Sequence, residues 1–515
     1  MTPQTIADLV DAAAVAWPTD LACVDGDRRL SFRELRDEIV RAAAALAASG
    51  LQKDDALALW GPNGLEWLTV SLGAAYIGAR VVPLNTRYRA DEAADILQRS
   101  RSRMLFTVNG FLGYDYLTAL RSSTTDLPHL QETVLLRGDD EGAISLDTFL
   151  KRAGRLPRVT VTADDVSHIQ YTSGTTGRAK GALLCHGAMV GTTRDWAANV
   201  GLQRGDRYLI VSPFFHISGH KTGVLACLTA GATMYPQAVF DPVVVMQRVQ
   251  DERITMLPGP PTIYQTLLEH PRRAEFDLSS LQLAVTGAAS IPAVLIGRMF
   301  DELGFDRVIT AYGITETTGV VTMCRPGDDI ETIASTSGRV IPGVEIIIAA
   351  MDESTPREAG AGEILVRGYN VMKGYLDDAV ATRESIDEDG WFHSGDVGSL
   401  DDAGNLRITD RIKDLFIVGG FNVYPAEIEA TMLTHPAVAA VAVVGVPDDR
   451  MGEVGAAFVV ARQPIAAEEL IAWCREHLAN FKVPRRIHFV EMLPVNASGK
   501  VTKFELRALA QRQKD

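Results

Sequence analysis

A loop rich in glycine and hydroxyl side chains lies at residues 171–181, which read YTSGTTGRAKG between two apolar runs. Such a loop presents bare backbone N–H groups and hydroxyl donors, the groups from which polyphosphate oxygens accept hydrogen bonds. Arg178 and Lys180 add positive charge. The residues expected to contact phosphate are Thr172, Ser173, Gly174, Thr175, Thr176, Gly177 and Lys180. The pattern therefore predicts a site for a phosphate chain.

The spacing of this loop differs from that of the P-loop of nucleoside triphosphatases. A P-loop follows G-x-x-x-x-G-K-[ST], and its last hydroxyl binds Mg²⁺. Here Gly174, Gly177 and Lys180 stand three residues apart, and Gly181 follows the lysine. A flexible surface turn is the alternative interpretation, since clusters of Gly, Ser and Thr usually form turns. The length and order of the string favour the phosphate loop.

Length and composition limit the class of protein. A chain of 515 residues with 47% hydrophobic residues is globular and too long for one ordinary core, so we expect at least two domains. The net charge of −15 argues against nucleic acid as a partner. Five separated cysteines without a CxxC pair indicate reduced thiols and a cytoplasmic location. We expect neither a secretion signal nor a membrane-spanning helix. The oligomeric state stays open, with a homodimer as one candidate.

Apolar runs alternate with helical periodicity along most of the chain. Ser31 and Glu34 form a capping box that opens a helix to about residue 49. Strands are predicted at 55–61, 79–85, 208–213, 254–258, 281–287 and 308–313. This alternation predicts α/β layering with buried sheets. Apolar runs at 343–349 and 362–368, with turn residues between them, predict a more antiparallel β region.

Five further segments place polar and glycine residues in a distinctive order. They are Tyr312–Glu316 (YGITE), Trp391–Asp396 (WFHSGD), Asp410–Asp414 (DRIKD), Gly419–Pro425 (GGFNVYP) and Asn496–Lys500 (NASGK). Together with the loop at 171–181, they resemble the AMP-forming adenylating superfamily of acyl-CoA synthetases, peptide-synthetase adenylation domains and firefly-type luciferases. The resemblance covers essentially the whole chain, and so many motifs in register are very specific. It implies that ATP converts a small carboxylic acid to an acyl-adenylate and then to an acyl-CoA, with Mg²⁺ and CoA also required.

The resemblance implies two domains. We expect a large α/β domain at residues 1–412, with two β-sheet subdomains and a β region, which binds the acid and ATP. A small, mobile α+β domain should follow at 413–515, with a hinge at Lys413. The sequence pattern after Lys413 agrees with such a domain, since it predicts helices at 427–433 and 468–479 that alternate with strands at 438–446 and 487–489.

The resemblance assigns most nucleotide contacts to the large domain. The loop at 171–181 would hold the β- and γ-phosphates, and Thr315 would contact the α-phosphate. Glu316 is the expected Mg²⁺ ligand, because a hard cation bridging phosphate oxygens needs a carboxylate. Asp396 would accept from the ribose hydroxyls and Arg411 would donate to the ribose. The residues expected around adenine are Gly287, Ala288, Ala289, Tyr312 and Gly313.

The C-terminal motifs are assigned by resemblance alone. Lys500 matches the lysine that bridges the substrate carboxylate and the α-phosphate during adenylation. Rotation about Lys413 would then bring Gly419 and Gly420 to the active site, where residues without side chains can line a pantetheine tunnel. Without the resemblance, Lys500 would be interpreted as a solvated charge and Lys413 as part of an exposed charged turn.

The acid is expected beside His216, which matches an aromatic or histidine gate near the carboxylate. Phe214 and Phe215 precede it, and Gly219, His220 and Lys221 follow. A satisfied core histidine is the alternative interpretation of His216. No acidic residue lies in 213–221 to pair with a substrate ammonium, so we expect an acid without an α-amine.

Finer resemblances concern the acid. The strings at 212–216, 257–268, 419–429 and 480–485 resemble actinobacterial ligases for steroid-derived acids, in particular for a bicyclic indanedione propanoate. Such a pocket would be wide and mostly apolar, with a few donors for ring ketones. The alternatives are a medium-chain fatty-acid or aryl-acid CoA ligase, an enzyme that loads a carrier protein, and a non-catalytic nucleotide-binding relative.

Overall fold

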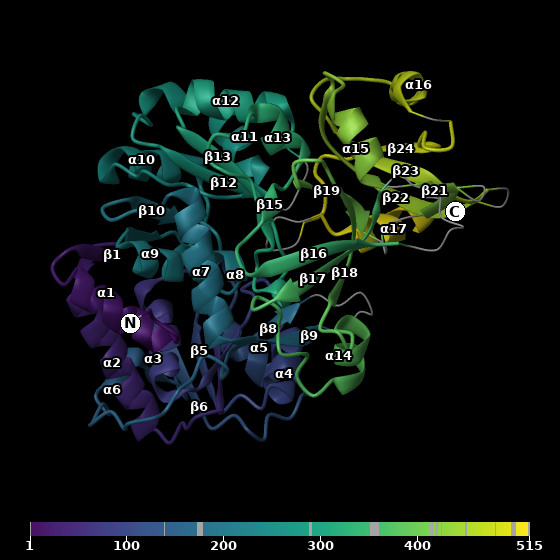
Figure 1. The fold of residues 1–515 in the computed structure, drawn as a ribbon. Coiled ribbons are helices and arrows are strands. Elements are labelled where there is room, and N and C mark those ends of the chain that lie inside the picture. Colours follow the sequence, from purple (N-terminus) through teal and green to yellow (C-terminus); the bar gives the residue numbers. More distant parts are fainter. Residues whose placement is uncertain are drawn as a thin grey trace.

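The computed structural model describes most of the chain, and Figure 1 shows a large body with a smaller C-terminal lobe. The described residues are 2–138, 140–172, 179–287, 291–350, 360–411, 414, 416–418, 421–423, 425–448, 451–478, 480–495 and 501–512. For residues 410, 411, 417, 421, 422 and 511 only the backbone is described. Within this part of the chain, no helix is long and apolar enough to cross a membrane.

The first sheet has seven strands in the order β7-β6-β5-β3-β4-β8-β9. Its strands are β3 (Ala56–Trp60), β4 (Arg80–Pro83), β5 (Met104–Val108), β6 (Glu132–Arg137), β7 (Ile144–Ser145), β8 (Val166–Thr172) and β9 (Lys180–Cys185). All neighbours are parallel except β8 and β9. Every residue of β3 and β5 is buried, as expected for parallel strands covered on both faces. The strands predicted at 55–61 and 79–85 are confirmed.

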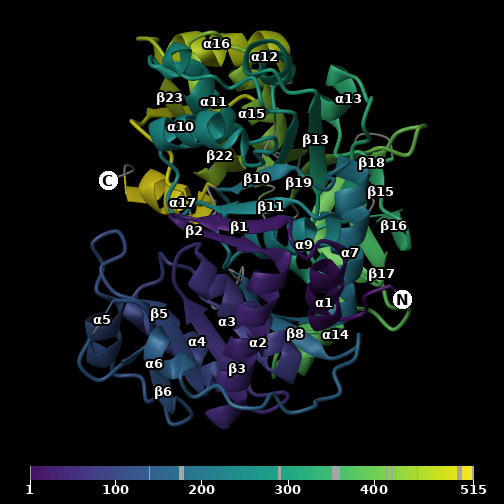
Figure 2. The same ribbon diagram turned by 90° about the vertical axis from the view of Figure 1, so that its left-hand side faces the viewer.

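Helices cover this sheet, and Figure 2 shows α2 (Phe32–Ala48) and α3 (Leu65–Ile77) side by side. The others near it are α4 (Ala90–Arg99), α5 (Tyr116–Ser122) and α6 (Leu146–Leu150). The predicted capping box opens α2, because Glu34 N donates to Ser31 Oγ (3.3 Å) and Ser31 N donates to the Glu34 carboxylate (2.8 Å). α3 is apolar and buried almost all round, which suits a helix packed between α2 and the sheet.

The second sheet consists of two four-stranded parts, β10-β11-β1-β2 and β12-β13-β14-β15. Its strands are β1 (Leu21–Asp25), β2 (Arg28–Ser31), β10 (Arg207–Ile210), β11 (Thr233–Pro236), β12 (Leu283–Gly287), β13 (Arg307–Tyr312), β14 (Thr322–Met323) and β15 (Arg339–Val340). Met256 bridges Tyr208 of β10 and Leu283 of β12, so the two parts join. Strands β10, β12 and β13 confirm three predicted strands, although β10 ends before Pro213.

The strand predicted at 254–258 is wrong. Met256 alone makes a β-bridge there. Pro258, Pro260 and Pro261 have no N–H group to donate to a neighbouring strand, so in this described segment only Leu257 N and Gly259 N bond to β12, at Leu283 O (3.1 Å) and Val285 O (3.0 Å). The chain instead turns into α11, which begins at Pro261.

The helices around the second sheet include α7 (His186–Val200), which runs between the two sheets in Figure 1. The others are α1 (Ile6–Ala16), α8 (Ile217–Gly219), the π-helix η1 (His220–Leu225), α9 (Ala226–Ala230), α10 (Pro242–Glu252), α11 (Pro261–Glu269), the 3₁₀-helix η2 (Arg273–Glu275), α12 (Ala293–Leu303) and α13 (Ile330–Ser335). Helix α8 continues directly into η1 and α9.

The third sheet is antiparallel, as predicted for this region. Its order is β16-β17-β18-β19, with β16 (Val344–Ala349), β17 (Gly362–Gly368), β18 (Phe392–Leu400) and β19 (Leu406–Arg411). Helix α14 (Ala379–Ser385) lies between β17 and β18 in the chain. This sheet packs on the same continuous core as the first two, which extends as far as Leu406.

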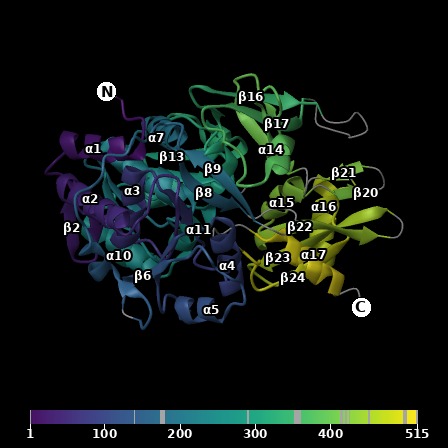
Figure 3. The same cartoon turned by 90° about the horizontal axis from the view of Figure 1, so that it is seen from below.

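The C-terminal lobe is a small α+β unit, seen from below in Figure 3. It contains β20 (Phe416–Val418), β21 (Phe421–Val423), α15 (Pro425–Leu433), β22 (Val438–Asp448), β23 (Gly452–Ala461), α16 (Ala467–His477), β24 (Arg486–Phe489) and α17 (Lys503–Arg512). Its buried residues form two clusters, between 416 and 510, that contain no residue of the large body. The fold class, α/β with a small α+β unit, is confirmed, and the predicted boundary residue Lys413 lies outside the described part.

The large body contains three buried histidines: His168 on β8, His186 at the start of α7 and His220 in η1. The rings of His168 and His220 are 4.8 Å apart between centroids. Burial lowers the pKa of His220 to about 3 and that of His186 to about 4, and it lowers the pKa of His168 well below the usual value. All three rings are therefore neutral at physiological pH.

This cluster predicts acid sensitivity. The unfolded chain, with a histidine pKa near 6.5, binds protons more readily than the folded chain, so stability is complete above pH 6.5 and falls as the pH drops below it. Each ring contributes up to about 1.4 kcal/mol per pH unit in that window. We expect the thermal midpoint of wild type to fall steeply below pH 6.5, and His220→Gln to flatten the dependence.

The control for this experiment is His129→Gln, since His129 is exposed and should leave the slope unchanged. Differential scanning calorimetry at a series of pH values measures all three midpoints. A wild-type midpoint that stays constant from pH 6.5 down to about pH 4.5 would contradict the assignment, because neutral buried rings must resist protonation.

Candidate active site

The turn that follows β13 is the centre of the site. Tyr312 ends β13, and the chain passes through Gly313 into the 3₁₀-helix η3 (Thr315–Thr317). The turn folds back so closely that a Cβ on Gly313 would lie 2.4 Å from Val320 N, so only glycine fits there. Thr318 closes the turn with φ +51°. The motif Tyr312–Glu316 therefore lies in a tight turn that requires glycine at position 313.

The turn is bound to the segment before α14. Met372 N donates to Glu316 O (2.8 Å), and Thr318 Oγ1 donates to Asn370 O (2.7 Å). Asn370 is fully buried and donates in turn to Val320 O (2.9 Å). These bonds fix the position of η3, and with it the half-buried side chains of Thr315 and Glu316.

Glu316 lies beside Thr172, the last described residue before the segment at 173–178. Its Oε1 accepts from Thr172 Oγ1 (3.3 Å), at the end of β8, and from Tyr375 OH (3.0 Å). Lys180 begins β9 opposite Thr172, and its Nζ lies 5.2 Å from the centre of the Tyr375 ring. A carboxylate, two hydroxyls and an ammonium group therefore gather where the predicted loop begins and ends. The structure brings Thr172, Lys180 and Glu316 together as the sequence predicted.

Sequence reasoning missed Tyr375. Burial and the neighbouring Glu316 carboxylate raise the pKa of its phenol, so the hydroxyl keeps its proton and donates to Glu316. Gly374 and Thr382 hold the tyrosine in place, since Tyr375 N donates to Thr382 Oγ1 (2.9 Å). Its contact with Glu316 spans 59 residues, so no local pattern in the sequence identified it.

A cavity of about 520 Å³ opens beside this cluster. The residues that line it include Lys180, Gly181, Tyr375, Arg99 and Arg101. The Arg99 guanidinium is 5.0 Å from the centre of the Tyr171 ring and donates to Ala179 O (2.8 Å). Asp377 and Asp378 also line the cavity, so its walls carry both signs of charge.

Asp396 contacts Tyr312, the residue at the start of the turn that follows β13. It is buried on β18, and Tyr312 OH donates to its Oδ2 (2.7 Å). Ser394 Oγ accepts from Asp396 N (3.0 Å), which shapes the backbone before the carboxylate. In the register of β18 and β19, Asp396 stands opposite Arg411, whose side chain is not described. The structure thus joins the predicted ribose and adenine residues directly.

Gly287 ends β12 and stands opposite Ala311, one residue before Tyr312. The carboxyl ends of adjacent parallel strands commonly bind nucleotides. The predicted site residues that lie outside the described part are Ser173, Gly174, Thr175, Thr176, Gly177, Ala288, Ala289, Lys413, Gly419, Gly420 and Lys500.

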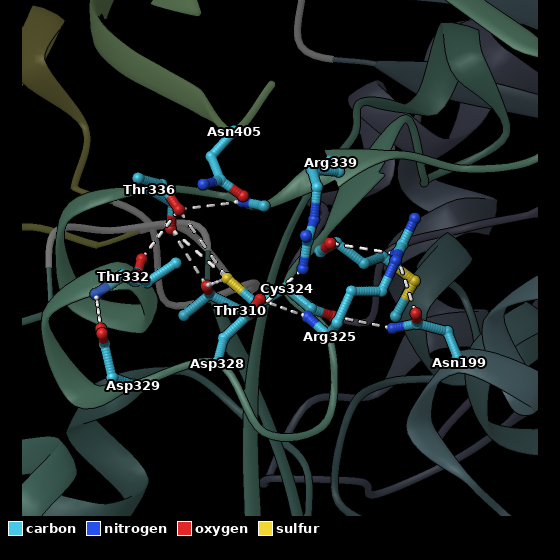
Figure 4. A network of polar contacts seen from close by, with 12 residues as sticks. Asn199, Thr310, Cys324, Arg325, Asp328, Asp329, Thr332, Thr336, Arg339 and Asn405 are labelled. Atoms are coloured by element: carbon cyan, nitrogen blue, oxygen red, sulfur yellow. Dashed lines mark hydrogen bonds and ion pairs between the residues drawn. The ribbon is translucent and has the colours of Figure 1, made fainter. Parts of the chain in front are cut away.

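A polar network beneath β13 supports the turn, and Figure 4 shows it. Thr310 Oγ1 donates to Ile333 O and Thr336 O (both 3.1 Å) and lies 3.0 Å from Cys324 Sγ. Asn199 at the end of α7 donates to Cys324 O (2.8 Å). Two residues before Tyr312, β13 is therefore fixed to α13 and α7.

His216 lies at the start of α8, in the segment that follows β10. It caps α8, and its Nδ1 accepts from Ser218 N (3.2 Å). Burial lowers its pKa to about 4, so the ring is neutral and carries its proton on Nε2. The Ile217 side chain would lie 3.1 Å from a Cβ on Gly319, so this segment packs directly on the turn after β13.

Two further residues were missed by the sequence analysis. Asn63 is buried, accepts from Phe214 N (2.6 Å) and donates to Ser212 O (2.9 Å). Gln170 on β8 donates to Phe215 O (2.8 Å). Both amides hold the segment before His216 from elements far away in sequence, so no local pattern could have identified them.

Comparison with known proteins places this site in context. The family model described as AMP-binding enzyme matches residues 10–376, and that of the AMP-binding enzyme C-terminal domain matches residues 427–500. A ligase of Mycobacterium tuberculosis named 3-[(3aS,4S,7aS)-7a-methyl-1,5-dioxo-octahydro-1H-inden-4-yl]propanoyl:CoA ligase is 49% identical, over 98% of this chain and 99% of its own. A Rhodococcus jostii ligase of the same name is also 49% identical, over 98% of both chains.

Solved structures agree with these matches over nearly the whole chain. The anthranilate CoA ligase AuaEII in complex with anthranoyl-AMP has a TM-score of 0.89 at 26% identity, covering 98% of this chain and 97% of its own. The o-succinylbenzoate CoA synthetase of Bacillus subtilis in complex with ATP and magnesium ion has a TM-score of 0.82 at 31% identity, covering 98% and 99%. The chain belongs to the AMP-binding enzyme family.

Proposed function

We propose that the protein uses ATP to convert a carboxylic acid to an acyl-adenylate and then transfers the acyl group to CoA, releasing pyrophosphate and AMP. One observation carries this proposal: a single turn connects the Glu316 cluster with the Tyr312–Asp396 pair. A nucleotide bound along that turn would have its base and ribose at one end and its phosphates at the other. Membership of the AMP-binding enzyme family supports the same chemistry.

Glu316 is proposed as the Mg²⁺ ligand. Among the described residues, no group of three or more His, Cys, Asp and Glu side chains could hold a metal ion. A single carboxylate suits Mg²⁺, which is usually held by one or two carboxylates, substrate phosphates and water. When bound, the ion would neutralise charge on the phosphate oxygens. Thr172 and Tyr375 orient the Glu316 carboxylate, and Lys180 with the loop at 173–178 would hold the β- and γ-phosphates.

Asp396 and Tyr312 are proposed to hold the nucleoside. The bond from Tyr312 OH fixes one carboxylate oxygen of Asp396, and the carboxylate would accept from the ribose hydroxyls with Arg411 as a further donor. The Tyr312 ring and the backbone at Gly287–Ala289 and Gly313 would border the adenine. Thr315, at the start of η3, would donate to the α-phosphate.

The acid is proposed to bind between the turn and His216. Neutral His216 carries its proton on Nε2, so it can donate to a carboxylate oxygen without adding charge. Lys500 would bridge that carboxylate and the α-phosphate. For the thioester step we propose rotation of residues 413–515 about Lys413 against residues 1–412, bringing Gly419 and Gly420 to the site. The separate hydrophobic cores of the two parts support such a motion.

The proposed acid is a bicyclic propanoate with ring ketones from steroid degradation. The support is the 49% identity to the two indane-dione propanoyl:CoA ligases over nearly the whole chain. A medium-chain or aromatic acid is the second candidate, since the human medium-chain acyl-CoA ligase ACSF2 is 31% identical and a feruloyl-CoA synthase of Amycolatopsis is 36% identical. Transfer to a carrier protein instead of CoA is the remaining alternative.

We also propose a cytoplasmic location and leave a homodimer as the candidate assembly. All five cysteines are buried and free, as expected where thiols stay reduced. Burial raises the pKa of Cys474 to about 11, so this thiol stays protonated.

Glu316→Gln tests the proposed metal ligand. The amide keeps the shape but loses the negative charge, so we expect kcat/KM for adenylation to fall by about 100-fold or more. Excess Mg²⁺ should restore part of the activity. Tyr375→Phe, which removes only one bond to Glu316, should cost about tenfold or less. Equal activity of Glu316→Gln and wild type at every Mg²⁺ concentration would exclude Glu316 as the ligand.

Asp396→Asn tests the ribose contact. Loss of an ionised acceptor should raise KM for ATP by about 10- to 100-fold, because hydrogen bonds to charged groups contribute roughly 1.5–3 kcal/mol. KM for the acid should change little. Tyr312→Phe is the matched control, which keeps the ring and should have a smaller effect. Steady-state kinetics would refute the role if KM rose for the acid alone.

Substrate profiling tests the proposed function itself. Purified enzyme is given ATP, Mg²⁺ and CoA with the bicyclic diketone propanoate, octanoate or benzoate, and AMP release is measured. We expect the highest kcat/KM with the bicyclic acid. Equal or faster turnover of octanoate or benzoate would reject this acid, and turnover only in the presence of a phosphopantetheinyl protein would reject CoA as acceptor.

A further inference from the structure

Lys221 is buried without a hydrogen-bond partner in the described part of the structure. None of its surface is exposed to solvent, and its Nζ makes no hydrogen bond there. Burial lowers its pKa to about 7, partly opposed by the Asp195 carboxylate. Asp195 is bonded to Tyr369 OH (2.5 Å) and Arg194 Nε (3.0 Å), and in the described part it makes no hydrogen bond with Lys221 Nζ.

An amine in this state opposes folding. Removing it from water without a partner costs free energy, whereas a methionine of similar length would pack there without that penalty. Buried polar groups without partners are uncommon in native proteins and often mark functional positions. Stability therefore does not explain a lysine at this position.

Lys221 belongs to the same helical segment as His216, beside which the acid is proposed to bind. It lies in the π-helix η1, a form of helix frequent at functional sites, five residues after His216 in one continuous helical segment. That segment packs on the turn after β13 through Ile217 and Gly319. Lys221 and His216 therefore belong to one segment that packs on this turn.

The neighbours of Lys221 in η1 face elsewhere. His220 Nε2 lies 3.2 Å from Ser71 Oγ, and its ring packs on Trp67 of α3. A Cβ on Gly223 would lie 2.8 Å from Ile210 Cγ2 of β10. Helix α7 also packs on η1, and it carries Asp195, whose charge acts on Lys221.

We propose that Lys221 is a specificity-determining residue whose Nζ donates a hydrogen bond to a carbonyl oxygen of the acid, distant from the reacting carboxylate. The inference rests on the proposed function and names the feature by which that site selects its substrate. Both the ammonium and the neutral amine can donate, so the interaction does not depend on the protonation state.

This arrangement discriminates against plain acids. A keto acid supplies the acceptor that Lys221 lacks, whereas an alkyl chain fills the same space and leaves the amine unpaired. A site built to hydrogen-bond a substrate group rejects the analogue without that group far more strongly than a purely apolar pocket does. Lys221 would therefore favour the ring ketone of a bicyclic propanoate over octanoate.

The experiment compares Lys221→Met with wild type on two acids: the bicyclic diketone propanoate and the same bicyclic propanoate without its ring carbonyls. The quantity measured is the ratio of kcat/KM for the two acids. We expect this ratio to fall by about 10- to 100-fold in Lys221→Met, in line with the loss of one strong hydrogen bond. Turnover of the carbocyclic acid should be unchanged or higher.

Lys221→Gln, which keeps a donor, should retain part of the preference, and the exposed Lys151→Met is the control that should behave as wild type. The thermal midpoint of Lys221→Met should equal or exceed that of wild type. A wild-type ratio preserved in Lys221→Met would overturn the inference, as would a lowered midpoint with equal loss of both acids. Failure of the proposed function would look different: wild type would turn over neither acid.

Discussion

The turn between Tyr312 and Val320 is the constraint on which the rest of the site depends. Tyr312 at its start bonds to Asp396 of the third sheet, and Glu316 in its middle bonds to Thr172 of the first. The turn itself ends a strand of the second sheet. Three sheets therefore meet at one short segment, and a shift of that segment would separate the groups proposed for the nucleoside from those proposed for the phosphates.

Several polar side chains of the large body hold this turn in place. Thr310 and Asn199 fix β13 from below, and Asn370 fixes the returning strand. Asn63 and Gln170 hold the neighbouring segment that carries His216. Each of these amides and hydroxyls bonds to a backbone group far away in the sequence. The site is therefore held by side-chain to backbone hydrogen bonds as well as by the sheets.

Much of the fold could be predicted from the sequence, because strands with continuous apolar runs and a helix with a capping box carry local signals. The segment at 254–258 was predicted wrongly as a strand, since its residues are apolar but its proline cannot donate a hydrogen bond, and Met256 alone forms a β-bridge there. In the site, motifs identified Glu316, Asp396 and Tyr312. Tyr375 and Asn63 act through contacts between distant segments, and no local pattern in the chain specifies such contacts.

Lys221 shows a second limit of prediction from the sequence. The sequence places it near the acid, but it cannot tell whether a lysine there is solvated, paired or isolated. The structure shows that the Lys221 side chain is fully buried in η1, which packs on α7 and β10. The stability lost by burying this amine is explained when the proposed ligand is included.

Exchange of radiolabelled pyrophosphate into ATP tests the central claim most directly, because it reports formation of the acyl-adenylate without the thioester step. The purified protein is incubated with ATP, Mg²⁺ and labelled pyrophosphate, with and without the bicyclic diketone propanoate, in the absence of CoA. The account predicts exchange that requires the acid and saturates with its concentration. Exchange with no acid present, or no exchange with the bicyclic, medium-chain or aromatic acids, would contradict it.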